Sequence, residues 1–104
     1  MNHQELLALL TPLGETSDQV CRSLKERGIK GDMWCGSSCP IANYLRKETG
    51  VLVSVNTRQV SIFDPRNKSH EHYLDQELPA AISAFIRNFD NRAYPELIHP
   101  GYDE

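Results

Sequence analysis

Hydrophobic residues recur at helical spacing in three segments of the first half of the chain, which predicts three helices. The first spans 4–10, where four leucines fall within seven residues. The second spans 16–27 and begins at Thr16, whose side chain can cap free backbone N–H groups. The third spans 40–49, with Pro40 at the first helical position, where a missing N–H costs nothing.

The pattern then changes to an alternation of two residues, which predicts a β-hairpin. Segments 51–55 and 60–63 are rich in β-branched residues, and a turn at Thr57 and Arg58 joins them. This register pairs Val55 with Val60 and places one apolar set on a single face: Val51, Val53, Val55, Val60 and Ile62.

A third strand over 70–74 and a last helix after Leu78-Pro79 complete the predicted fold. The last helix has a strong apolar face and ends near Asp90. We expect this face to cover the valine face of the hairpin, because a lone hairpin is barely stable in water. The fold class is therefore α+β, with three N-terminal helices, an antiparallel hairpin or three-stranded meander, and a C-terminal helix packed on the sheet.

A length of 104 residues fits one ordinary domain, and 39% hydrophobic with 24% charged residues are near globular values. We expect a single compact domain over 1–98 and a flexible acidic tail over 99–104. No apolar run is long enough to span a membrane, and no basic stretch of a secretory signal precedes the N-terminal apolar run. The expected location is cytoplasmic, without a membrane partner.

Charge is unevenly spread along the chain. The net charge is −3, yet basic residues outnumber acidic ones from Arg22 to Lys47, and acidic residues dominate after Glu71. Solvated faces of opposite charge explain this pattern, and a basic contact surface is the alternative.

Segment 34–40 has the sequence WCGSSCP and carries the most suggestive chemistry. A thiol at a helix N-terminus has a lowered pKa and is more nucleophilic, which favours Cys39 as the reactive residue. The alternatives are buried structural thiols and a disulfide between Cys35 and Cys39. No spacing places a histidine base nearby.

A zinc site is a further hypothesis. Cys21, Cys35 and Cys39 with either His70 or His72 have the ligand types of a Cys3His site. The ligand spacing that is typical of zinc knuckles occurs only once, however, so no cofactor is expected.

Trp34 is the only tryptophan and lies between glycines, so it either covers the core or anchors a partner. A different alternative is a winged helix, in which Asn43, Arg46 and Lys47 of the third helix contact DNA together with Arg58 of the hairpin turn. A connection of about ten residues between the second and third helices speaks against it.

Phosphate-binding loops, metalloprotease motifs and serine-hydrolase motifs are absent, so the sequence leaves enzymatic activity open but favours none. The favoured hypothesis is an interaction or regulatory domain that binds a protein partner through 33–47. DNA binding and cysteine- or zinc-dependent activity remain alternatives, and the oligomeric state stays open. The candidate binding residues are Trp34, Cys35, Cys39, Asn43, Arg46, Lys47 and Arg58.

Overall fold

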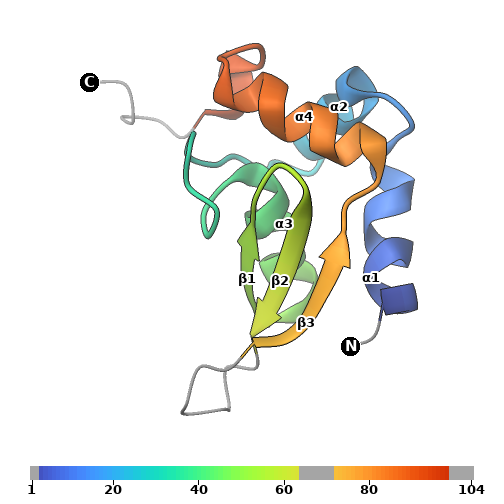
Figure 1. Ribbon diagram of the computed structural model, residues 1–104. Coiled ribbons are helices and arrows are strands. Elements are labelled where there is room, and N and C mark those ends of the chain that lie inside the picture. The colour runs from blue at the N-terminus through green and yellow to red at the C-terminus, as the bar shows by residue number, and fades with distance from the viewer. Residues whose placement is uncertain (1–2, 64–71, 99–104) are drawn as a thin grey trace.

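The structure, a computed structural model, describes residues 3–63 and 72–98 and confirms the predicted order of elements. Three helices precede a three-stranded antiparallel sheet, and a fourth helix follows it (Figure 1). The elements are α1 (His3–Leu10), the 3-10 turn η1 (Thr11–Leu13), α2 (Ser17–Glu26), α3 (Pro40–Thr49), β1 (Leu52–Val55), β2 (Gln59–Phe63), β3 (His72–Glu77), α4 (Ala80–Asp90) and the 3-10 turn η2 (Pro95–Leu97).

The ends of α2 follow the sequence pattern closely. Thr16 Oγ1 accepts a hydrogen bond from the Gln19 N–H at 3.2 Å, as predicted for the cap. The Gln19 side chain in turn reaches back past Thr16 and accepts from the Glu15 N–H at 2.8 Å. At the other end, Gly28 has a φ of 71°, and the Ile29 N–H returns to the Leu24 carbonyl at 2.9 Å.

The register of the hairpin is confirmed, with Val55 opposite Val60 and Val53 opposite Ile62. Thr57 and Arg58 are not a preferred turn pair. Asn56 supplies the missing stabilisation, because its Oδ1 accepts from the N–H groups of Arg58 at 2.7 Å and Gln59 at 2.8 Å.

The third strand exists, but β3 extends further along the chain than the predicted 70–74. It pairs with β2 in a register that shifts between Ile62 and Phe63, where the ladder contains an irregularity. Residues 70 and 71 lie outside the described part of the chain.

Two helices share the covering of the sheet. α3 lies along β1 on the buried face, and α1 lies beside β3 (Figure 1). The predicted packing of α4 on the valine face is only partly right, because α4 packs mainly along α2. α4 meets the sheet at the β1–β2 turn, where the Ser83 hydroxyl donates to the Thr57 carbonyl.

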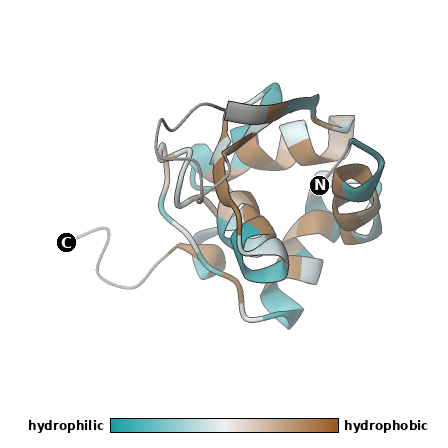
Figure 2. Cartoon of the chain, turned by 90° about the horizontal axis from the view of Figure 1, so that it is seen from below, coloured by the Kyte–Doolittle hydropathy of each residue, from teal (hydrophilic) through white to brown (hydrophobic). Residues whose placement is uncertain are grey.

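The buried apolar residues of these elements form one continuous cluster. At its centre, the Phe85 ring stacks on Phe89 at 5.9 Å and on Tyr94 at 5.3 Å between ring centroids. The helices carry both hydrophobic and hydrophilic residues (Figure 2). Within the described residues, no helix has the length and apolar character to cross a membrane. The predicted tail, 99–104, lies outside the described residues.

Candidate functional site

The long connection between α2 and α3, residues 27–39, is fastened at two points by backbone hydrogen bonds to other elements. The Gly31 N–H donates to the Leu97 carbonyl at 2.9 Å. The Val55 N–H of β1 donates to the Gly36 carbonyl at 2.8 Å. Segment 31–39, called the thiol loop below, is thus held between η2 and the edge of the sheet.

Both glycines of the thiol loop stand where a side chain has no room. A Cβ on Gly31 would lie 2.4 Å from the Pro40 nitrogen, and one on Gly36 would lie 2.6 Å from the Val55 carbonyl oxygen. In each case the obstacle is backbone, which cannot move aside cheaply. Glycine therefore allows the close approach that fixes the loop.

Met33 and Trp34 point in opposite directions from the thiol loop. Met33 is buried, with 3% of its surface exposed, whereas Trp34 exposes 73%. Trp34 has a φ of 58°, a conformation that non-glycine residues rarely adopt. Its backbone N–H donates to Asp90 Oδ1 of α4 at 2.9 Å, and this hydrogen bond holds the conformation. Trp34 therefore does not cover the core: Met33 is buried there, and Trp34 faces solvent.

A pocket of about 240 Å³ lies at the base of Trp34. The thiol loop, the β1–β2 turn and α4 form its walls. The lining residues are Trp34, Cys35, Gly36, Cys39, Val55, Asn56, Thr57, Ile86 and Asp90. Asp90 is the one charged residue among them, so the pocket combines apolar and thiol surface with a single carboxylate.

Cys35 is partly exposed at this pocket and is surrounded by hydroxyl groups. The Ser38 hydroxyl lies 2.8 Å from its Sγ and the Ser37 hydroxyl 3.7 Å. Hydrogen bonds from Ser38 and then Ser37 lower the pKa of Cys35. The Ser38 hydroxyl also lies 3.1 Å from Asp32 Oδ2, and its single hydrogen serves one acceptor at a time. The Cys35 thiolate and the Asp32 carboxylate therefore compete for the hydrogen of the Ser38 hydroxyl.

Cys39 behaves differently from what its position at the helix start predicts. It is the N-cap residue of α3, but its side chain makes no capping hydrogen bond. Burial raises the pKa of Cys39 to about 11, although the N–H groups of Ala42 and Ile41 favour the thiolate. Desolvation outweighs the helix N-terminus here. The pKa values thus point to Cys35, not Cys39, as the more reactive thiol.

The three cysteines are free thiols, and the described residues bring no three His, Cys, Asp or Glu side chains together as a metal site. Cys21 lies against η2, where its thiol donates to Glu96 Oε1 at 3.3 Å. Burial and this hydrogen bond raise the pKa of Cys21 to about 11. His70 of the zinc hypothesis lies outside the described residues.

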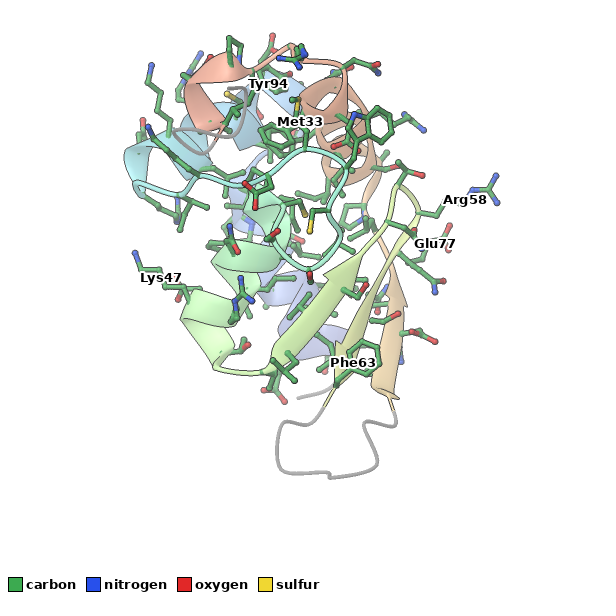
Figure 3. The ribbon with its side chains drawn as sticks, turned by 90° about the vertical axis from the view of Figure 1, so that its left-hand side faces the viewer. Met33, Lys47, Arg58, Phe63, Glu77 and Tyr94 are labelled. Atoms are coloured by element: carbon green, nitrogen blue, oxygen red, sulfur yellow. The ribbon has the colours of Figure 1, made fainter. Side chains whose placement is uncertain are left out.

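The basic candidate residues do not lie at the pocket. Arg46 and Lys47 are exposed near the C-terminus of α3, and Arg58 is exposed at the β1–β2 turn. Lys47 and Arg58 lie on opposite sides of the molecule in Figure 3. The structure therefore brings together Trp34, Cys35 and Cys39, but separates them from the basic groups of α3.

Asn43 has a structural partner for each part of its amide. Its Nδ2 donates to the carbonyls of Lys30 at 2.7 Å and Ser38 at 3.0 Å. Its Oδ1 accepts from Arg46. Asn43 thus ties Lys30, which precedes the thiol loop, and Ser38, near the end of the loop, to α3, a role that sequence alone did not indicate.

Sequence reasoning missed the pocket residues that come from other elements. Asp90 and Ile86 of α4 and Val55 of β1 are far from Trp34 in the chain. The spacing of Ile86 and Val55 marked them only as core residues, and nothing marked Asp90. Comparison with protein-family models, with curated proteins and with solved structures found no match for this chain.

Proposed function

We propose that this protein is an interaction domain that binds a segment of a protein partner with Trp34 and the pocket at its base. The observation that carries the proposal is the exposure of Trp34, 73%, on a loop fastened to η2, β1 and α4. Exposed tryptophans that are held rigidly make strong contacts, because little side-chain and backbone freedom is lost on binding.

The backbone of Trp34 supports the same proposal. A non-glycine residue at a φ of 58° costs about 1–2 kcal/mol. Such strain persists only where surrounding contacts impose it, as the Asp90 carboxylate does here. Burial of the indole does not offset this strain, because the indole is exposed. A role of Trp34 in recognition would explain why the strained residue is kept.

The pocket indicates the chemistry of the partner. An aliphatic or aromatic side chain fits against Trp34, Val55 and Ile86, and the Asp90 carboxylate favours a basic group beside it. The expected ligand is therefore a short segment with an apolar residue flanked by Lys or Arg. The negative net charge of the chain also favours a positively charged ligand.

DNA binding has less support from the geometry. Residues 27–39 separate α2 from α3, whereas a helix-turn-helix joins its helices with three or four residues. The amide of Asn43 is bound to Lys30, Ser38 and Arg46, so it is not turned to a ligand.

Fluorescence-labelled peptides with a central Leu or Phe test the proposal, one set flanked by Lys and one by Glu. We expect saturable binding of the Lys-flanked set, measured by anisotropy under reducing conditions. Trp34→Ala should weaken it by about 2 kcal/mol or more, roughly 30-fold. Asp90→Asn keeps an acceptor for the Trp34 N–H but removes the charge, so it should remove the preference for Lys.

Leu52 provides a matched control, because it is the other large apolar residue described as exposed, at 41%, and lies outside the pocket. Leu52→Ala should leave peptide binding unchanged. Equal binding by Trp34→Ala and wild type, or binding that Leu52→Ala abolishes, would refute the proposed surface. A salt-dependent gel shift with DNA and no peptide binding would favour the DNA-binding alternative instead.

A further inference from the structure

We propose that Cys35 and Cys39 form a reversible dithiol–disulfide pair, in which Cys35 reacts first with a small disulfide and Cys39 then displaces the attached group. Both thiols lie in the wall of the same pocket. The proposal goes beyond peptide binding and does not depend on it, since its evidence is the chemistry of the thiols alone.

The chain reverses direction between the two cysteines. The Ser38 N–H donates to the Cys35 carbonyl at 3.3 Å, which closes a turn over residues 35–38. Such a turn brings its first and last Cα atoms within about 7 Å, and Cys39 is the next residue. Disulfides join Cα atoms about 4.4–6.8 Å apart, so the bridge requires Cys39, one residue beyond the turn, to come within that range of Cys35.

Exposure and hydrogen bonding divide the two roles. Cys35 is partly exposed, and the hydroxyls of Ser38 and Ser37 stabilise its thiolate, which is the attacking form. Cys39 exposes 4% of its surface, and burial raises its pKa to about 11. It is therefore shielded from reagents in solution but adjacent to whatever becomes attached in the pocket.

The first step also prepares the second. After burial, which is the largest cause, and the charge of Asp90, a negative charge on Cys35 also raises the pKa of Cys39. That charge disappears when the Cys35 sulfur becomes part of a mixed disulfide. Cys39 then loses its proton more readily than before, and its thiolate can attack the Cys35 sulfur.

The electrons and atoms balance without any other reagent. The Cys35 thiolate attacks one sulfur of RS–SR, so a Cys35–SR bond forms and one RS⁻ leaves. The Cys39 thiolate attacks the Cys35 sulfur, the Cys35–Cys39 bond forms and the second RS⁻ leaves. The protons of the two protein thiols end on the two RS⁻ groups. The protein loses two hydrogens, and one small disulfide becomes two thiols.

Charge near the thiols indicates which small disulfide reacts faster. Asp32 shares the Ser38 hydroxyl with Cys35, and Asp90 lies in the pocket wall. These carboxylates repel an anionic reagent and attract a cationic one. We therefore expect the cationic disulfide cystamine to react faster than oxidised glutathione, which is anionic. Cys21 should not take part, because its thiol is buried and bound to Glu96 on η2.

The test follows the intact mass of the reduced protein after addition of cystamine, with an acid quench. Wild type should lose two hydrogens and retain no adduct. Cys39→Ala should retain one cysteamine adduct on Cys35, and Cys35→Ser should stay unmodified while folded. Cys21→Ser is the matched control and should behave as wild type. Far-UV circular dichroism confirms that each variant is folded.

Two results would overturn the dithiol–disulfide pair, and a third would refute the predicted preference for a cationic disulfide. Modification of Cys35→Ser at the rate of wild type would place the reactive thiol elsewhere. A stable adduct on wild type, equal to that on Cys39→Ala, would exclude the second step. Faster reaction with oxidised glutathione than with cystamine would contradict the effect of the carboxylates. Peptide binding, measured on reduced protein, remains a separate test of the proposed function.

Discussion

The neighbouring residues Met33 and Trp34 give the sharpest test of how the thiol loop divides stability from recognition. Met33 exposes 3% and Trp34 73% of its surface. Truncation of a buried methionine to alanine costs about 2–5 kcal/mol. About a quarter of the Trp34 surface is buried, so roughly 60 Å² are lost at about 25 cal/mol per Å², at most about 1.5 kcal/mol.

Urea unfolding followed by far-UV circular dichroism measures both changes, because Trp34 is the only tryptophan and its fluorescence is lost in its own variants. Thermal unfolding should agree, at about 4–8 °C per kcal/mol for a domain near this size. We expect Met33→Ala to lower the free energy of unfolding by more than Trp34→Ala does. Equal losses would show that Trp34 supports the core, and its role as a binding residue would then be untenable.

The backbone of Trp34 predicts that glycine and alanine at this position differ in stability in the reverse of their usual order. Glycine is usually less stable than alanine within regular structure by about 0.5–1 kcal/mol. At a φ of 58°, alanine retains the steric cost and glycine does not. Trp34→Gly should therefore be more stable than Trp34→Ala. The reverse order would mean that the left-handed conformation is not kept in solution.

Three further results are expected. Ser38→Ala should raise the pKa of Cys35, which the pH midpoint of its alkylation by iodoacetamide measures. Gly36→Ala places a Cβ 2.6 Å from the Val55 carbonyl, so it should cost about 1–3 kcal/mol and expose the Val55 N–H to hydrogen exchange. Because Cys39 has a pKa of about 11 when folded and about 8.5 when unfolded, the folded state keeps its proton longer. Stability should therefore fall by up to about 3 kcal/mol between these pH values, and Cys39→Ala should lessen the fall.

Local features of the fold could be predicted from the sequence because near neighbours in the chain determine them. Thr16 and Gly28 mark the ends of α2 through hydrogen bonds to residues within a few positions. The alternation of valines sets the hairpin register, since a slip of one residue would turn Val53 and Val55 away from the core.

Packing between distant elements could not be predicted in the same way. The apolar stripe of α4 shows that this helix is buried on one side, but it does not identify the neighbour. The stripe packs mainly along α2, and α3 takes the place along β1. Periodicity shows which side of a helix is buried, but it does not show which element that side packs against.

The same limit explains why the pKa of Cys39 is raised and not lowered as its position at the helix start predicts. The helix start at Pro40 is a local property, and it correctly predicts that N–H groups favour the Cys39 thiolate. The burial that overrides this effect comes from packing against distant elements. The hydroxyls of Ser37 and Ser38 are local to Cys35, and the turn that aims them at the sulfur could have been suspected from Gly36.

The apolar and thiol residues of the thiol loop fall into two groups, one buried and one partly or largely exposed, and each group needs its own explanation. Met33 and Cys39 are buried, so packing accounts for both. Trp34 and Cys35 gain little from burial, and Trp34 also carries the cost of a left-handed backbone. Stability alone gives no reason for these two residues. They line one pocket, which is why we propose both recognition and thiol chemistry at that place and not at the basic end of α3.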